Sequence, residues 1–246
     1  MKRFRVGITA ANQGDNLIEA LWSNGIGQNV AYLIMLLQRL NCVESVCVIS
    51  GAGGKGHALA RAFGVPTRPL PDALSELDLV IELGARAMTP EMLETLHANG
   101  GKLVSYVAGN VMIMGFEELA CGAPHGDSVF SEWFDACWVT PQHWQTCHSY
   151  LEATRSPRTR KAPHIWDPHC IRAAALENGK NPYYRPPDDG KWLLGCFDPS
   201  VNVVKTFHFP VLVADQAYRR RPDLIAGMML FSAESLKRDP HVEQFI

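Results

Sequence analysis

The sequence predicts an α/β protein built on a parallel sheet that helices cover on both faces. Short runs of apolar and β-branched residues alternate with helical stretches through the N-terminal part of the chain. Strands that are continuously apolar and separated by helices are typical of a buried parallel sheet. The alternation stops in a proline-rich stretch and then restarts, so we expect two units of the same kind.

The first expected strand, at residues 4–9, leads through a long loop into the segment SNGIGQNVAYLIMLLQRL at 23–40. Gly25 and Gly27 precede an amphipathic apolar helix there. A helix that begins at the carboxyl edge of a sheet points free N–H groups and its positive dipole end toward ligands. The third glycine of a dinucleotide fingerprint is replaced by Val30. The loop is therefore either a ligand-facing turn or a turn that only packs the helix on the sheet.

The rest of the N-terminal part continues the alternation. The expected strands lie at 45–50, 78–83, 102–107 and 135–139, and the expected helices at 57–63, 90–99, 111–119 and from 141 onward. Pro90 in the first turn of its helix is typical of a helix start.

Prolines gather between residues 157 and 187, together with basic residues, which indicates a segment that crosses between domains. We expect an N-terminal domain at 1–160, a crossing segment at 161–190 with one helix, at 169–177, and a second domain at 191–246. That second domain has two expected strands, at 192–197 and 227–231, a helix within 203–221 and a last helix from 234. Two parallel strands do not make a stable sheet alone, so either they join other strands or the domain is incomplete, and we expect an incomplete domain.

The composition is that of an ordinary soluble globular protein, with 47% hydrophobic and 20% charged residues and a formal net charge of -2. Nothing in it points to nucleic acid as a partner. The N-terminus lacks the apolar core of a signal peptide, and no run approaches the roughly 18 apolar residues that cross a bilayer. The seven cysteines form no CxxC pair, which fits reduced thiols. We expect a cytoplasmic protein and leave peripheral membrane association and the oligomeric state open.

Four segments carry a resemblance to a known family: 23–40, SYVAGNV at 105–111, HIWDP at 164–168 and CFDPSVNVVKTFHFPVLVADQAYRRRPDLI at 196–225. They resemble a bacterial family of unknown function whose members are similar to GT-B glycosyltransferases. The resemblance implies a GT-B-like arrangement of two Rossmann-like domains with parallel sheets facing a cleft. It also implies an acceptor on the N-terminal side, a nucleotide-sugar donor on the C-terminal side, and no cofactor. In agreement, the sequence has no DxD pair and no cluster at metal-ligand spacing.

Glycosyl transfer needs a base for the acceptor hydroxyl and positive charge against the departing diphosphate. Base candidates are carboxylates and histidines on expected loops or near a helix start, with the first two ranked highest: Asp15, His125, Glu19, Asp127 and His143. Expected substrate-binding residues lie on the cleft wall of the N-terminal domain: Gly25, Gly27, Gln28 and Asn110. Lys205 and Asn202 are expected at the donor phosphates.

Each of these polar candidates has a structural alternative. Asn110 and Asn202 are equally suited to cap a helix, and Lys205 to lie on a solvated helix face. The expected activity is transfer of a sugar to an unknown acceptor in surface polysaccharide or glycoconjugate synthesis. Two other functions stay open: a non-catalytic binding remnant of the fold, and a nicotinamide-dependent oxidoreductase. The oxidoreductase predicts an acidic residue at the end of the second strand, where Ser50 stands.

Overall fold

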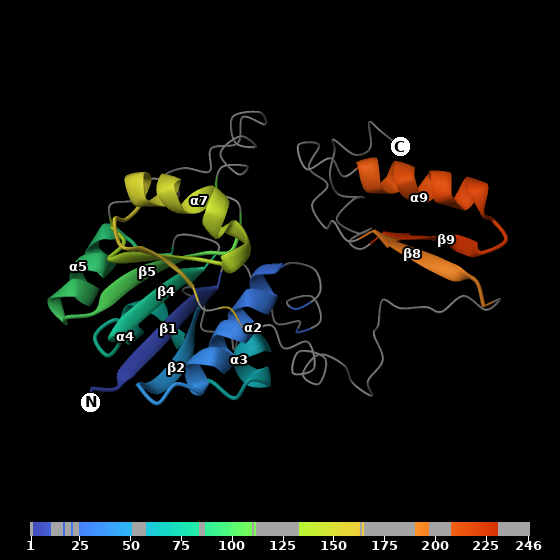
Figure 1. Cartoon of the computed structure of the whole chain (residues 1–246). Helices are drawn as coiled ribbons and strands as arrows, with labels where there is room; N and C mark the ends of the chain where they lie inside the picture. The colour runs from blue at the N-terminus through green and yellow to red at the C-terminus, as the bar shows by residue number, and fades with distance from the viewer. Residues whose placement is uncertain are drawn as a thin grey trace. The chain divides into compact units, whose positions relative to one another are not determined.

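A computed structural model of the chain describes residues 2–10, 17, 21, 25–50, 58–83, 87–109, 111, 133–162, 164, 190–196 and 208–230. The chain divides into two compact units, Met1–Ala175 and Leu176–Ile246, and each is described by itself (Figure 1).

The first unit is built on a seven-stranded sheet in which every pairing is parallel. Its strand order is β3-β2-β1-β4-β5-β6-β7. The strands are β1 Phe4–Ala10, β2 Val43–Ser50, β3 Thr67–Pro69, β4 Leu79–Leu83, β5 Lys102–Val107, β6 Ala136–Val139 and β7 Thr159–Lys161. This confirms the expected parallel α/β sheet. The order is that of a Rossmann-like sheet, and its direction of growth reverses between β1 and β4.

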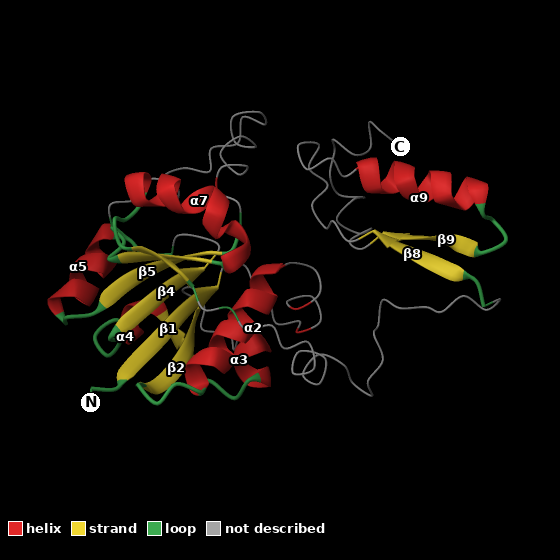
Figure 2. Cartoon of the chain, in the orientation of Figure 1, coloured by secondary structure: helices red, strands yellow, loops and turns green. Residues whose placement is uncertain are grey.

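Helices cover both faces of this sheet (Figure 2). The described helices of the unit are α2 Gly25–Gln38, α3 Ala58–Ala62, α4 Leu70–Ala73, α5 Pro90–Ala98 and α7 Pro141–Thr154. α2 and α3 share one apolar cluster with the strands, and α4 and α5 share another with the opposite face. Alternate residues of a strand point to opposite faces, so β4 contributes Ile81 to the first cluster and Val80 to the second.

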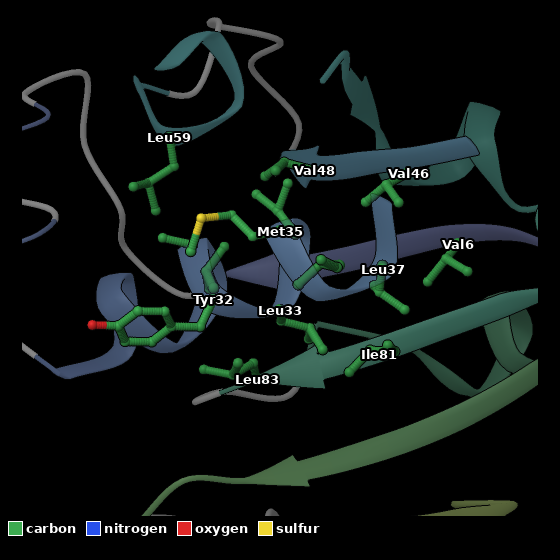
Figure 3. Packing of buried hydrophobic residues seen from close by; sticks show 14 of the residues in the cluster. Val6, Tyr32, Leu33, Met35, Leu37, Val46, Val48, Leu59, Ile81 and Leu83 are labelled. Carbon is green, nitrogen blue, oxygen red and sulfur yellow. The ribbon is translucent and has the colours of Figure 1, made fainter. Parts of the chain in front are cut away.

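The core on the α2 face is dense and apolar (Figure 3). Leu33 and Leu37 of α2 lie over Val6 of β1 and Ile81 of β4 in one cluster. The helix repeats apolar residues at spacings of three and four, so one stripe can be buried along its length. Burial of these side chains holds the helix at a fixed height on the sheet, which fixes where its first turn lies.

Local signals explain the limits of α5. Thr89 caps the helix, because its side chain accepts a hydrogen bond from the backbone N–H of Met92 at 3.3 Å. Pro90 occupies the first turn, as expected, and the chain leaves the helix at Gly100 with a φ of 75°. After Gly100 the chain reverses its direction and forms β5.

Among the elements that the structure describes, three were not expected from the sequence: β3, α4 and β7. β7 lies in the basic stretch that we expected to lead out of the first domain, yet it pairs in parallel with β6. The sheet therefore extends as far as Lys161, into the segment expected to cross between domains, and the division of the chain comes after Ala175.

The second unit contains β8 Trp192–Cys196, α9 His208–Arg220 and β9 Ile225–Leu230. β8 and β9 pair in parallel as a two-stranded sheet, which agrees with the two strands expected there. The helices expected at 169–177 and from 234, and all but residue 111 of the helix expected at 111–119, lie outside the described residues. Within the described part of the chain, no helix is long and apolar enough to span a membrane.

Candidate ligand site at the carboxyl edge of the seven-stranded sheet

The order of the sheet singles out the carboxyl ends of β1 and β4. Ala10 and Leu83 pair at the ends of these two strands. The connections that follow these two strands run to opposite faces of the sheet. In open α/β sheets, ligands bind in the crevice that forms between two such neighbouring strands. The carboxyl edge of the sheet at β1 and β4 is therefore the candidate site.

The first turn of α2 belongs to this edge. The helix ends at Gln38 and β2 begins at Val43, so the chain turns at the amino edge and the start of α2 lies at the carboxyl edge. Gly25 is the first residue of the helix, and Gly27 is buried in its first turn. The helix carries no acidic residue in this turn, so no carboxylate of the helix itself offsets the positive end of its dipole.

Gln28 ties this turn to the chain before it. Its side-chain amide donates a hydrogen bond to the carbonyl of Leu21 at 2.7 Å, and Leu21 is fully buried. Gln28 was expected on the ligand-facing wall. The structure places it in the first turn with Gly25 and Gly27 and gives its amide nitrogen a structural partner.

Two tyrosines and a histidine from three different elements meet on the same face of the sheet. Tyr106, near the end of β5, lies with its hydroxyl oxygen 3.4 Å from Nδ1 of His164, which follows β7. The Tyr32 ring of α2 meets the His164 ring edge-on, with 5.8 Å between ring centres. Figure 3 shows the Tyr32 hydroxyl pointing away from the apolar cluster, beyond the tips of the neighbouring strands. We call Tyr32, Tyr106 and His164 the aromatic trio.

The aromatic trio is uncharged near neutral pH. Burial raises the pKa of Tyr106 to about 12, so this hydroxyl keeps its proton. Burial also lowers the pKa of His164 below its ordinary value of 6.5, which favours the neutral imidazole. Both tyrosines are buried, whereas His164 is only half-buried, so the histidine is the accessible member.

On the opposite face, a buried carboxylate organises the connection that follows β4. Glu82 is 4% exposed, and its Oε1 accepts hydrogen bonds from the backbone N–H groups of Ala87 at 2.9 Å and Met88 at 2.8 Å. A charged acceptor with two backbone donors is a strong local restraint. Glu82 thus fixes the chain where it leaves the crevice toward α5. Glu82 was not among the predicted site residues, although an acidic residue inside an apolar strand was a usable signal.

Glu82 belongs to a row of polar side chains that runs across the sheet in register, from Thr9 through Glu82, Ser105 and Cys137 to Thr159. Arg155, just after α7, donates a hydrogen bond from Nη1 to Ser105 Oγ at 2.7 Å. Burial lowers the pKa of Arg155 and raises that of the Cys137 thiol to about 11. Cys137 is therefore a thiol of the core rather than a nucleophile. This row supports the fold beneath the site.

One base candidate, His143, lies among the described residues. It is half-buried in the first turn of α7, where burial lowers its pKa against the opposing effect of a hydrogen bond to the Ala108 backbone. The other predicted site residues lie outside the described residues, and their roles stay predictions: Asp15, Glu19, Asn110, His125, Asp127, Asn202 and Lys205. No three His, Cys, Asp or Glu side chains of the described segments gather as a metal site would require.

The fold and this edge define a Rossmann-like α/β protein. The chain belongs to the protein family of unknown function DUF2827, whose profile matches residues 6–246. No curated protein matches the chain.

Solved structures offer weak similarities only. Apo scyllo-inositol dehydrogenase from Lactobacillus casei shares 13% identity over 49% of this chain, with a TM-score of 0.29. The chain spans about a third of that structure's length, 34%. An AraC family transcriptional regulator from Pseudomonas putida shares 17% identity, with 65% of this chain and 76% of the regulator covered and a TM-score of 0.26.

Proposed function

We propose that the chain is a glycosyltransferase of the GT-B type, which transfers a sugar from a nucleotide-sugar donor to an acceptor. The observation that carries the proposal is the recurrence of parallel β-α-β architecture. A seven-stranded parallel sheet forms the core of the first unit, and β8, α9 and β9 of the second unit repeat the parallel β-α-β arrangement. A repeated Rossmann-like arrangement is what the resemblance to GT-B enzymes implies for this family.

In this proposal the first unit binds the acceptor and the sugar end of the donor, and the second unit binds the diphosphate of the donor. Gly25, Gly27 and Gln28 belong to the first turn of α2, where backbone N–H groups suit hydroxyl or phosphate oxygens. Asn110 would extend this wall, and Asp15 or His125 would serve as the base. In the second unit, Asn202 and Lys205 would neutralise the donor phosphates.

The nicotinamide-dependent alternative shares the strand order but lacks the local features of a dinucleotide site. A dinucleotide fingerprint places its glycines directly after the first strand, whereas residues 11–24 separate Ala10 from Gly25. Val30 is fully buried at the position of the third glycine, which normally permits close packing of helix and strand. β2 ends at Ser50, with no carboxylate for a ribose. These features argue against a dinucleotide ligand at this turn.

A thermal-shift panel on the full chain tests the proposal. UDP-, GDP-, ADP- and CMP-sugars are compared with NADH and with buffer alone. A donor present at a hundred times its Kd stabilises the unit that holds it by about 2.7 kcal/mol. This corresponds to roughly 10–20 °C in Tm for a unit of the size of Leu176–Ile246 and to about 5–10 °C for one of the size of Met1–Ala175. A shift with a nucleotide sugar supports the transferase. A shift with NADH alone favours the oxidoreductase, and no shift with any nucleotide favours the binding remnant.

The variant Lys205→Ala tests whether Lys205 binds the phosphates of the donor. Loss of a charged phosphate contact is expected to weaken nucleotide-sugar binding about 10- to 100-fold, as measured by calorimetric titration. Arg220→Ala is the matched control, because Arg220 is an exposed cation in the last turn of α9 in the same unit. Equal affinities in the two variants would remove Lys205 from the donor site.

A further inference from the structure

The hydrogen bond within the aromatic trio determines which nitrogen of His164 carries its proton. A buried tyrosine hydroxyl needs an acceptor, and Tyr106 is 4% exposed. Its hydroxyl keeps its proton because burial raises the pKa of Tyr106 to about 12. Nδ1 of His164 lies 3.4 Å from this hydroxyl and is the acceptor that the described residues supply. With the Tyr106 hydroxyl as the donor of this hydrogen bond, Nδ1 is the acceptor and carries no proton.

A neutral imidazole carries one N–H, so an accepting Nδ1 places the proton on Nε2. The edge-on contact of the Tyr32 ring, with 71° between the two ring planes, holds the imidazole in its orientation. His164 can then offer a ligand a neutral N–H donor and no basic nitrogen. In this state the residue is unsuited to act as the base of the reaction.

We propose that His164 binds the ligand of this edge through Nε2–H, as an uncharged hydrogen-bond donor to a sugar oxygen, and that Tyr106 is the positioning residue that sets this tautomer. The identity of the ligand rests on the proposed function. Sugars present hydroxyl and ring oxygens that accept from neutral donors, whereas diphosphates are recognised best by cations. The trio thus contributes to the sugar end of the ligand rather than to its phosphates.

Two substitutions at one position separate this role from simple packing. His164→Asn keeps a polar atom near the place of Nδ1, beside Tyr106, but has nothing at the place of Nε2. His164→Gln reaches the place of Nε2 with an amide N–H. We expect His164→Asn to weaken nucleotide-sugar binding about 3- to 10-fold, the effect of one neutral hydrogen bond, and His164→Gln to restore most of the affinity. The nucleoside diphosphate without its sugar should bind both variants equally.

Nitrogen NMR of the full chain labelled with ¹⁵N-histidine reads the tautomer directly. We expect the free protein near pH 7 to show His164 protonated at Nε2, and Tyr106→Phe to shift it toward a mixture of both tautomers. Addition of the nucleotide sugar that gives the largest thermal shift should change the chemical shifts of the His164 ring nitrogens. Addition of the corresponding nucleoside diphosphate should leave them unchanged. His97, which pairs with Asp135 beside the start of β6, is the internal control and should not move with either.

The outcomes distinguish the inference from the proposed function. If no nucleotide sugar binds the wild-type chain, the proposed function fails and the ligand assignment fails with it. If a nucleotide sugar binds but the His164 signals stay unchanged and His164→Asn binds normally, the inference is overturned and the transferase stands. The inference is also overturned if the NMR spectrum of the wild-type protein shows His164 with its proton on Nδ1.

Discussion

The two edges of the seven-stranded sheet carry opposite kinds of polar group. At the amino edge, Asp78 and Asp135 precede β4 and β6. Asp78 pairs with the cations Lys2 and Arg5, and Asp135 pairs with the cation Lys102. At the carboxyl edge, Tyr106 and His164 are uncharged, and Glu82 is held by backbone N–H groups. Charge at the amino edge is neutralised within the protein, whereas donors at the carboxyl edge stay suited to a ligand. We therefore expect changes at the amino edge to affect stability alone, and changes at the carboxyl edge to affect binding as well.

The largest effect is expected from Glu82→Gln. This change removes the charge from a buried acceptor of two backbone hydrogen bonds, near Arg155, and should lower the free energy of unfolding by about 2 kcal/mol. Urea denaturation of the full chain measures it. Because Glu82 fixes the connection that leaves the crevice, nucleotide-sugar affinity should fall too. Glu94→Gln on the exposed face of α5 is the control and should stay within about 0.5 kcal/mol of wild type. An equal effect of the two changes would contradict the role of Glu82.

A smaller effect is expected from Asp78→Asn at the amino edge. A hydrogen bond from the Arg5 backbone N–H, opposed by partial burial and supported by the Arg5 and Lys2 side chains, lowers the pKa of Asp78 from 3.8 to about 2. A folded-state pKa below the unfolded one adds stability above pH 4, and this contribution is lost as the pH falls from about 4 to 2. Solvent screening limits it to about 1 kcal/mol.

The Asp78 prediction is checked by unfolding curves of wild type and Asp78→Asn between pH 2 and pH 7. The difference between the two proteins should be full near neutral pH and vanish near pH 2. Asp72→Asn, an exposed change in α4, should show no comparable loss. Nucleotide-sugar affinity at neutral pH should be the same in all three, and a drop for Asp78→Asn would break the contrast between the edges.

The smallest effect is expected from Lys102→Ala, also at the amino edge. Lys102 Nζ lies 2.9 Å from Asp135 Oδ1, but its side chain is 58% exposed. Asp135 keeps the backbone N–H of Leu103 and the ring of His97 at 2.9 Å each after the change. The loss in unfolding free energy should stay below about 0.5 kcal/mol and diminish further in high salt. A loss above 1 kcal/mol would mean that the pair is far less screened than its exposure indicates.

Much of the fold could be predicted because its strands are long apolar runs. The expected strand at 102–107 is β5, and the expected helix at 90–99 differs from α5 by its last residue. β3 and β7 were missed because each has only three residues and no apolar periodicity. β7 exists through its pairing with β6, a tertiary effect that local propensity does not report.

The site was less accessible to prediction than the fold. The two glycines were recognisable from the sequence, although the structure places them in the first turn of α2 rather than in a loop before it, and the strand order then placed them at the carboxyl edge. The contact between Tyr106 and His164 joins residues 58 positions apart and depends on the unexpected strand β7. Each residue lay in a segment that carried the family resemblance, but no sequence pattern indicated that they meet.

Hydrogen exchange measured by mass spectrometry, with and without a saturating nucleotide sugar, tests most directly whether the ligand binds at the carboxyl edge. The account predicts slower exchange in peptides covering 25–28 and 106–109 on addition of the nucleotide sugar. Peptides of the amino edge, covering 78–79, 99–103 and 134–136, should exchange at unchanged rates. Protection confined to the amino edge, or binding that leaves the carboxyl-edge peptides unchanged, would contradict it.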